Sequence, residues 1–81
     1  MNRTDALDVV KESIVRVIPD ADVAALGPDD TFRDALEMDS LDFLSFIETL
    51  SERTGVRIDD EDTPCLTTLS GSADFLVART K

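Results

Sequence analysis

One serine stands out as the residue best placed to carry chemistry. Ser40 follows Asp39 directly, between a loop rich in Pro, Gly and Asp and the longest apolar-periodic segment of the chain. The Asp-Ser pair predicts a helix start, with Asp39 as the N-cap and Ser40 in the first turn. A hydroxyl there points into solvent at the positive end of the helix dipole, which would stabilise an anion built on its oxygen. Ser40 is therefore either an attachment point or a residue that only starts a helix.

The residue types present exclude several other chemistries. The chain has one Cys and no His, so it can form no internal disulfide, no Cys/His zinc site and no Ser-His or Cys-His nucleophile pair. No general acid–base couple is recognisable, and a chain of this size has little room for a pocket. The acidic run 59–62 lacks the alternating ligands, the Gly and the final Glu of an EF-hand. We therefore predict a protein that is not an enzyme, with no catalytic residue and no metal site.

The charge of the chain restricts its partners. Eighteen acidic residues against eight basic ones give a net charge of -10. This balance argues against nucleic acid and against an anionic membrane surface, because both require clustered Lys and Arg. It favours proteins with basic patches. With no apolar signal region and no apolar run long enough for a membrane helix, we expect a cytoplasmic protein.

Two long helices are predicted to flank a long loop. The first begins with Thr4 as its cap, ends before Pro19 and carries an apolar stripe, made of Ala6, Leu7, Val10, Ile14, Val17 and Ile18. Residues 19–39 form the loop, with Phe32 and Leu36 as its anchors to the core. The second runs from about Ser40 to about Arg53 and ends at Gly55 as a left-handed cap. Its core face is Phe43, Phe46, Ile47 and Leu50, with Leu41 and Leu44 toward the exposed edge.

The last third of the chain predicts one short and one long helix. Residues 63–66 form a short helical turn in which Cys65 is expected to be semi-buried. Thr67 or Thr68 caps the last helix, and Arg79 and Lys81 suit its C-terminal end. Its core face is Leu69, Ala73, Leu76 and Val77, with Phe75 beside it. No strand-like alternation persists, so residues 1–81 predict one all-α domain, a small four-helix bundle with three longer helices and one short one, expected to be monomeric.

An ordered set of motifs accompanies Ser40, and together they resemble the acyl carrier proteins. The set is Phe32-x-x-x-Leu36-x-x-Asp39-Ser40-Leu41-Asp42, then Gly55-Val56-x-Ile58, Asp60-Glu61-Asp62 and Thr67-Thr68-Leu69. The resemblance covers about residues 4–78. It implies that a phosphopantetheinyl transferase attaches 4'-phosphopantetheine from coenzyme A to Ser40. The thiol of that arm would hold acyl groups as thioesters and carry them between acyl-loading, condensing or transferring enzymes with basic docking patches.

The resemblance also implies a surface that partners recognise, made of Asp39, Leu41, Asp42, Leu44, Glu48 and Glu52. Several positions depart from the family pattern, above all Glu37, which stands where the family usually has Gly. These departures favour a specialised carrier, for a polyketide or an unusual lipid, over the housekeeping fatty-acid carrier. The bulk of Phe43 and Phe46 suggests short or polar cargo rather than long saturated chains. Two alternatives remain: an aminoacyl or peptidyl carrier fed by an adenylating enzyme, and an unmodified acidic module that binds other proteins.

Overall fold

Three long helices form the frame of the molecule. The computed structural model describes residues 1–80 and contains α1 (Arg3–Val17), α3 (Ser40–Thr54) and α4 (Leu69–Arg79). Two short helices complete it: α2 (Phe32–Ala35) and the 3-10 helix η1 (Asp60–Leu66). Within the described residues the only β-type pairing is an isolated bridge between Thr31 and Thr68. The prediction of an all-α bundle is confirmed, although η1 is longer than the short helix expected and α2 was not expected to be helical.

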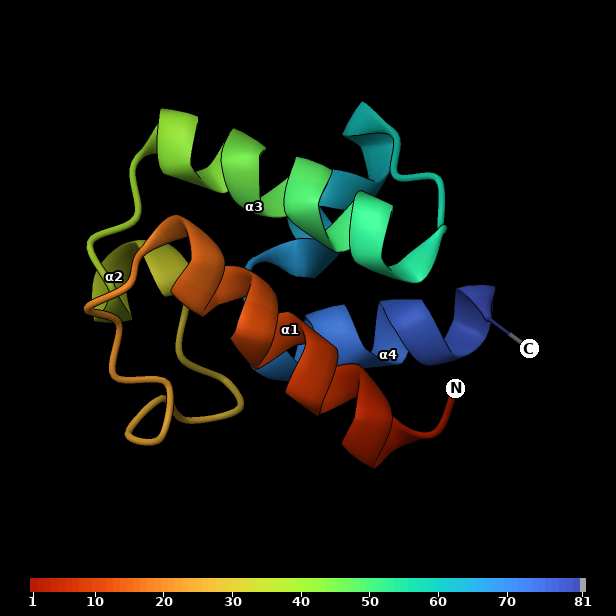
Figure 1. The fold of residues 1–81 in the computed structure, drawn as a ribbon, viewed down its shortest axis with the longest axis horizontal. Coiled ribbons are helices and arrows are strands. Elements are labelled where there is room, and N and C mark those ends of the chain that lie inside the picture. The colour runs from red at the N-terminus through yellow and green to blue at the C-terminus, as the bar shows by residue number, and fades with distance from the viewer. Residues whose placement is uncertain (81) are drawn as a thin grey trace.

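The helix α1 is the central element of this frame. It packs against both α3 and α4, and α4 packs in turn against η1. Figure 1 shows α1 and α4 crossing on one side of the molecule and α3 lying on the other, with the start of α1 and the end of α4 at the same end. The start of α3 lies at the opposite end, next to α2 and the long loop. This arrangement leaves one whole face of α3 without a packing partner.

The core is aliphatic and aromatic, as the composition requires. Its buried residues come from every helix and from the loops: Ala6, Val10, Ile14, Leu26, Phe32, Met38, Phe46, Ile47, Leu50, Leu66, Leu69, Ala73, Phe75 and Leu76. Two assignments on α4 need correction. Phe75 is a core residue rather than a neighbour of the core, while Val77 is only partly buried. The helix presents Ser72, Ala73, Phe75 and Leu76 inward because it is enclosed by both α1 and η1.

Most helix ends follow the predicted chemistry. Asp39 caps α3, Thr68 caps α4, and Gly55 ends α3 in the left-handed conformation with φ 70°. The cap of α1 is Asn2 rather than Thr4, because the Asn2 side chain accepts a hydrogen bond from the Asp5 amide at 2.8 Å. Thr4 consequently lies inside the first turn. Lys81 lies outside the described residues.

The long loop is fastened to the start of α4. The Phe32 amide donates to the Thr67 carbonyl oxygen, and the Ser70 amide donates to the Pro28 carbonyl oxygen, both at 2.9 Å. Phe32 is almost fully buried and Leu36 is half-buried against the core, so both predicted anchors are confirmed. These bonds hold the loop and the start of α2 against the start of α4.

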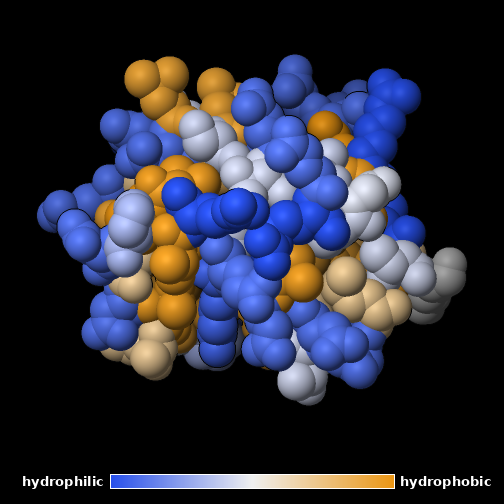
Figure 2. Space-filling model, viewed as in Figure 1, coloured by the Kyte–Doolittle hydropathy of each residue, from blue (hydrophilic) through white to orange (hydrophobic). Residues whose placement is uncertain are grey.

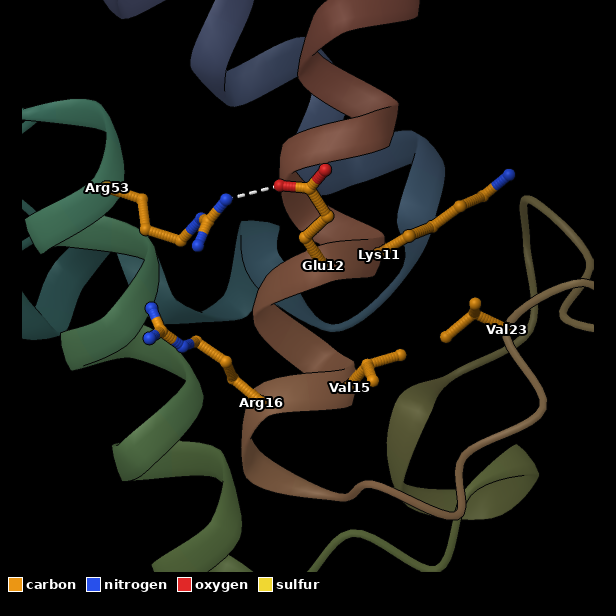
Figure 3. Close-up of a pocket in the computed structure, with 6 residues that line it drawn as sticks. All are labelled: Lys11, Glu12, Val15, Arg16, Val23 and Arg53. Carbon is orange, nitrogen blue, oxygen red and sulfur yellow. Dashed lines mark hydrogen bonds and ion pairs between the residues drawn. The ribbon is translucent and has the colours of Figure 1, made fainter.

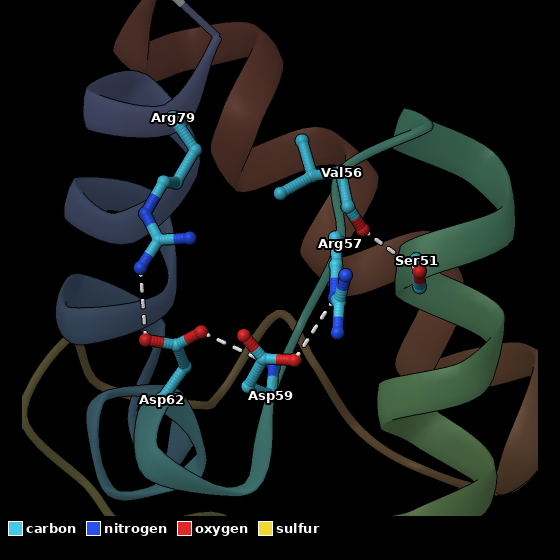
Figure 4. A network of polar contacts seen from close by, with 6 residues as sticks. All are labelled: Ser51, Val56, Arg57, Asp59, Asp62 and Arg79. Carbon is cyan, nitrogen blue, oxygen red and sulfur yellow. Dashed lines mark hydrogen bonds and ion pairs between the residues drawn. The ribbon is translucent and has the colours of Figure 1, made fainter.

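A polar network links η1 to α4 and the segment before η1 to α3 (Figure 4). The Asp62 carboxylate accepts from the Asp59 amide at 3.1 Å and from the Arg79 guanidinium at 2.9 Å. On the α3 side, the Ser51 hydroxyl donates to the Val56 carbonyl oxygen at 2.7 Å. The acidic run is therefore a structured turn that holds η1 against α4.

The contact between η1 and α4 depends on a glycine. A Cβ built on Gly71 would lie 2.4 Å from the Cys65 carbonyl oxygen, which is too close for any other residue. Gly71 therefore stands inside α4 because the two backbones approach each other closely there. The expectation for Cys65 is wrong: its side chain is exposed, since Leu66 takes the inward position of η1 and is fully buried.

Candidate functional site

Ser40 is the first residue of α3 and is exposed to solvent. Asp39 precedes it as the N-cap, and its Oδ1 accepts a hydrogen bond from the Asp42 amide at 2.8 Å. The backbone amides of Ser40 and Leu41 and the Ser40 hydroxyl make no hydrogen bond within residues 1–80. Unpaired amides at a helix N-terminus suit an anion. The local geometry therefore matches the prediction made from the Asp-Ser pair.

A strained turn places Ser40 at the surface. Glu37 has φ 53° and is the only non-glycine residue with positive φ in the described chain. This left-handed conformation is unfavourable for residues with a Cβ. It reverses the chain between α2 and α3, so that Met38 is 3% exposed and serves as a core residue. Met38 was not recognised from the sequence, because it lies in a segment with no helical periodicity.

Ser40 borders a groove, here called the Ser40 groove, with a volume of about 810 Å³. Its apolar wall consists of Phe32, Met38, Phe43 and Leu44. The charged and hydroxyl residues around it, besides Ser40 itself, are Arg33, Glu37, Asp39, Asp60, Thr63 and Thr67. The groove thus joins α2, η1 and the start of α3, and it offers an apolar surface directly beside the serine hydroxyl. Arg33 was not singled out from the sequence, and Thr63 and Thr67 were assigned only to helix ends, because these residues become neighbours of Ser40 only in the folded chain.

Three phenylalanines close the interior behind this groove. The rings of Phe32 and Phe46 meet edge to face, with centroids 5.3 Å apart and planes at 77°. The Phe43 ring lies 6.2 Å from that of Phe46. Phe46 is fully buried, whereas Phe43 is half-buried. These three residues, the phenylalanine cluster, thus connect the lining of the Ser40 groove with the buried core.

The predicted recognition residues lie along the uncovered side of α3. Leu41 and Leu44 are 75% and 54% exposed, which is unusual for large apolar side chains. Asp39, Glu48 and Glu52 are exposed and Asp42 is half-buried. Figure 2 shows hydrophobic surface protruding where the N-terminal part of α3 lies. The structure therefore places the predicted recognition residues along α3, with the two exposed leucines near Ser40 and with Glu48 and Glu52 farther along the helix.

A second groove lies between α1 and α3, away from Ser40 (Figure 3). It is lined by Lys11, Glu12, Val15, Arg16, Val23 and Arg53, and is called the basic groove here. Arg53 forms an ion pair with Glu12 across the two helices. None of its lining residues has a nucleophilic hydroxyl or thiol. The basic groove therefore offers no rival attachment point.

Comparison with known proteins assigns the family. Residues 8–76 match the family model described as the phosphopantetheine attachment site. The chain belongs to the acyl carrier protein family. It is 32% identical to an acyl carrier protein of Rubrobacter xylanophilus, over 95% of this chain and 94% of that protein. It is 36% identical to one of Thermosynechococcus vestitus, over 94% of this chain and 93% of that protein.

Membership of this family implies a cofactor and a general role. Acyl carrier proteins are carriers rather than catalysts, and they hold 4'-phosphopantetheine as a covalent group. The described residues fit such a group: they provide an exposed hydroxyl, two unpaired amides at a helix start and an adjoining apolar groove. No helix among residues 1–80 combines the length and the apolar character needed to cross a membrane.

Proposed function

We propose that Ser40 is the residue that carries 4'-phosphopantetheine, and that this chain moves acyl groups between enzymes as thioesters on that arm. The observation that carries the proposal is the setting of Ser40. It is the exposed serine that begins α3, where helix dipole and unpaired amides favour an anion. When bound, the arm supplies a terminal thiol, which can form thioesters.

The residues around Ser40 have separable parts in this function. Asp39 fixes the start of α3, because its side chain accepts a hydrogen bond from the Asp42 amide. Ser40 is therefore held at the first position of the helix, with its side chain exposed to solvent. The turn at Glu37 keeps the hydroxyl clear of the core while Met38 fills the space beneath it. An attacking hydroxyl that is already exposed needs no local unfolding to reach the active site of a phosphopantetheinyl transferase.

The exposed side of α3 is proposed as the surface that partner enzymes bind. Leu41 and Leu44 would provide the apolar contact, and the acids Asp39, Asp42, Glu48 and Glu52 would meet basic patches. Exposed charges of this kind give weak contacts that are screened by salt. Such contacts suit a carrier that must be released after each transfer.

We also propose a specialised pathway with short or polar cargo, such as a polyketide or an unusual lipid. The phenylalanine cluster supports this because a close-packed interior resists the entry of a long chain. Glu37 supports it because it adds a carboxylate beside the attachment point. An aminoacyl or peptidyl cargo is the second candidate, and the three carboxylates around the groove would favour its cationic amine.

The experiment is a loading assay with coenzyme A and a phosphopantetheinyl transferase, followed by intact mass. Wild type is expected to gain one arm, and Ser40→Ala none. Ser45→Ala removes another exposed serine of α3 and is expected to load like wild type. Both variants should keep the helical circular dichroism of wild type, because neither hydroxyl lies in the core. Loading of Ser40→Ala would contradict the assignment, and loading of neither variant nor wild type would favour the unmodified interaction module.

A further inference from the structure

Arg33 supplies positive charge to the Ser40 groove, whose other charged residues are acidic. It is exposed on α2, and it is the only basic side chain among the described residues that line this groove. The other charged residues there are the acids Glu37, Asp39 and Asp60. A phosphodiester on Ser40 would add further negative charge to this group. Arg33 is the side chain of the groove that can offset it.

Arg33 has no partner of its own within residues 1–80. Four other arginines do form ion pairs there: Arg3 with Asp74, Arg53 with Glu12, Arg57 with Asp59, and Arg79 with Asp62. The neighbouring carboxylate of Asp34 instead accepts from the Thr31 hydroxyl at 2.9 Å. Asp39 is engaged with the Asp42 amide. Acids are abundant in this chain of net charge -10, yet none of them pairs with Arg33 within residues 1–80. The N–H donors of the Arg33 guanidinium therefore stay available for an anion in the groove.

We propose that Arg33 is the counter-ion of the phosphodiester at Ser40, and that it directs the arm into the Ser40 groove. The proposal rests on the proposed attachment at Ser40. An arginine fork can bond two phosphate oxygens at once, which a lysine cannot match. The helix start offers its unpaired amides to the phosphate, and Arg33, which lines the same groove, offers its guanidinium.

This placement has a consequence for docking. An arm drawn toward Arg33 lies over Phe32 and Met38, which form part of the apolar wall of the groove. It then lies away from Leu41, which is not among the residues that line the groove. Leu41, Glu48 and Glu52 of α3 lie outside the groove and stay uncovered while the arm is stored, so a partner can bind there first and draw the arm out afterwards. Arg33 is in this sense a positioning residue.

The test is phosphorus-31 NMR of the arm-bearing protein, after intact mass has shown the arm in each sample. Arg33→Gln is expected to shift the phosphorus resonance and to remove nuclear Overhauser contacts between the arm and Phe32. Raising the salt concentration should move the wild-type resonance toward that of Arg33→Gln. Arg33→Lys should lie between the two. Arg16→Gln is the matched control, because Arg16 is another exposed arginine without an ion pair and lines the basic groove instead.

Two results would overturn the role of Arg33. One is an Arg33→Gln resonance that coincides with that of wild type, with contacts from the arm to Phe32 preserved. The other is an equal shift in Arg16→Gln, which would indicate a general charge effect. Amide spectra of the variants report whether the fold is intact. A failure of the arm to attach appears earlier, in the mass, and would count against Ser40 rather than against Arg33.

Discussion

Glu37 departs from the family pattern in its residue type but keeps the backbone conformation that the pattern indicates. The family resemblance marked this site as one that usually holds Gly, and the structure gives the reason: φ is 53°. The turn keeps its left-handed conformation although its residue has a Cβ. The backbone conformation is thus maintained by the surrounding contacts of Phe32, Leu36 and Met38 with the core.

At this residue we expect Glu37→Gly to stabilise the fold. Relief of the left-handed strain is offset in part by the greater entropy of Gly in the unfolded chain, leaving a gain of about 0.5–1 kcal/mol in the free energy of unfolding. Urea denaturation measures it. Glu37→Gln is the control, since it removes the charge but keeps the Cβ. If the Gln variant gained as much stability as the Gly variant, charge repulsion rather than backbone strain would be the cause.

At the scale of elements, the positions of the long helices could be predicted from the sequence, but the contacts between elements could not. The stripes of α1 and α3, the Asp39 cap and the Gly55 cap all follow from local periodicity and turn chemistry. The Ser40 groove does not, because α2, η1 and α3 approach only in the folded chain. Arg33 and Thr63 carry no local signal. The close approach at Gly71 is likewise set by tertiary packing.

The phenylalanine cluster leads to a prediction about cargo length. A long saturated acyl chain on the arm should leave the amide resonances of Phe46, Ile47 and Leu69 nearly where they are in the unacylated protein, because Phe43 and Phe46 block the way inward. Phe43→Ala should open that way and produce shifts with the same chain. Comparison of NMR spectra with short and long acyl groups tests it. Large shifts at these three residues in wild type would contradict the prediction.

At the scale of the whole molecule, charge is distributed unevenly. Figure 2 shows a strongly hydrophilic band across the middle of the face on which α1 lies, while apolar surface protrudes near the start of α3. Lys11 and Arg16 make no ion pair within residues 1–80 and line the basic groove, away from Ser40. We therefore expect a basic partner to be attracted to the acidic side of α3 rather than to the basic groove. The net charge was evident from the sequence, but the separation of the basic groove from the acidic side of α3 became evident only in the folded chain.

Loading by the transferase should accordingly depend on salt and on the acids of α3. Glu48→Lys is expected to raise KM about two- to five-fold at low salt, as befits an exposed ion pair of about 0.5–1 kcal/mol. The kcat should be unchanged, and the salt dependence should weaken. Asp20→Lys makes the same charge change on the long loop and serves as the control. An equal effect of both variants would show that only total charge matters.

The central claim, attachment at Ser40, is tested most directly by locating the arm on the wild-type protein. Trypsin cuts after Arg33 and Arg53, and the peptide between them contains Ser40, Ser45 and Ser51. Tandem mass spectrometry of that peptide, after loading from coenzyme A, can distinguish the three serine hydroxyls from one another and from that of Thr49. We predict a single phosphopantetheine on Ser40. An arm on Ser45 or Ser51, or a peptide that remains unmodified when a control carrier is loaded, would contradict it.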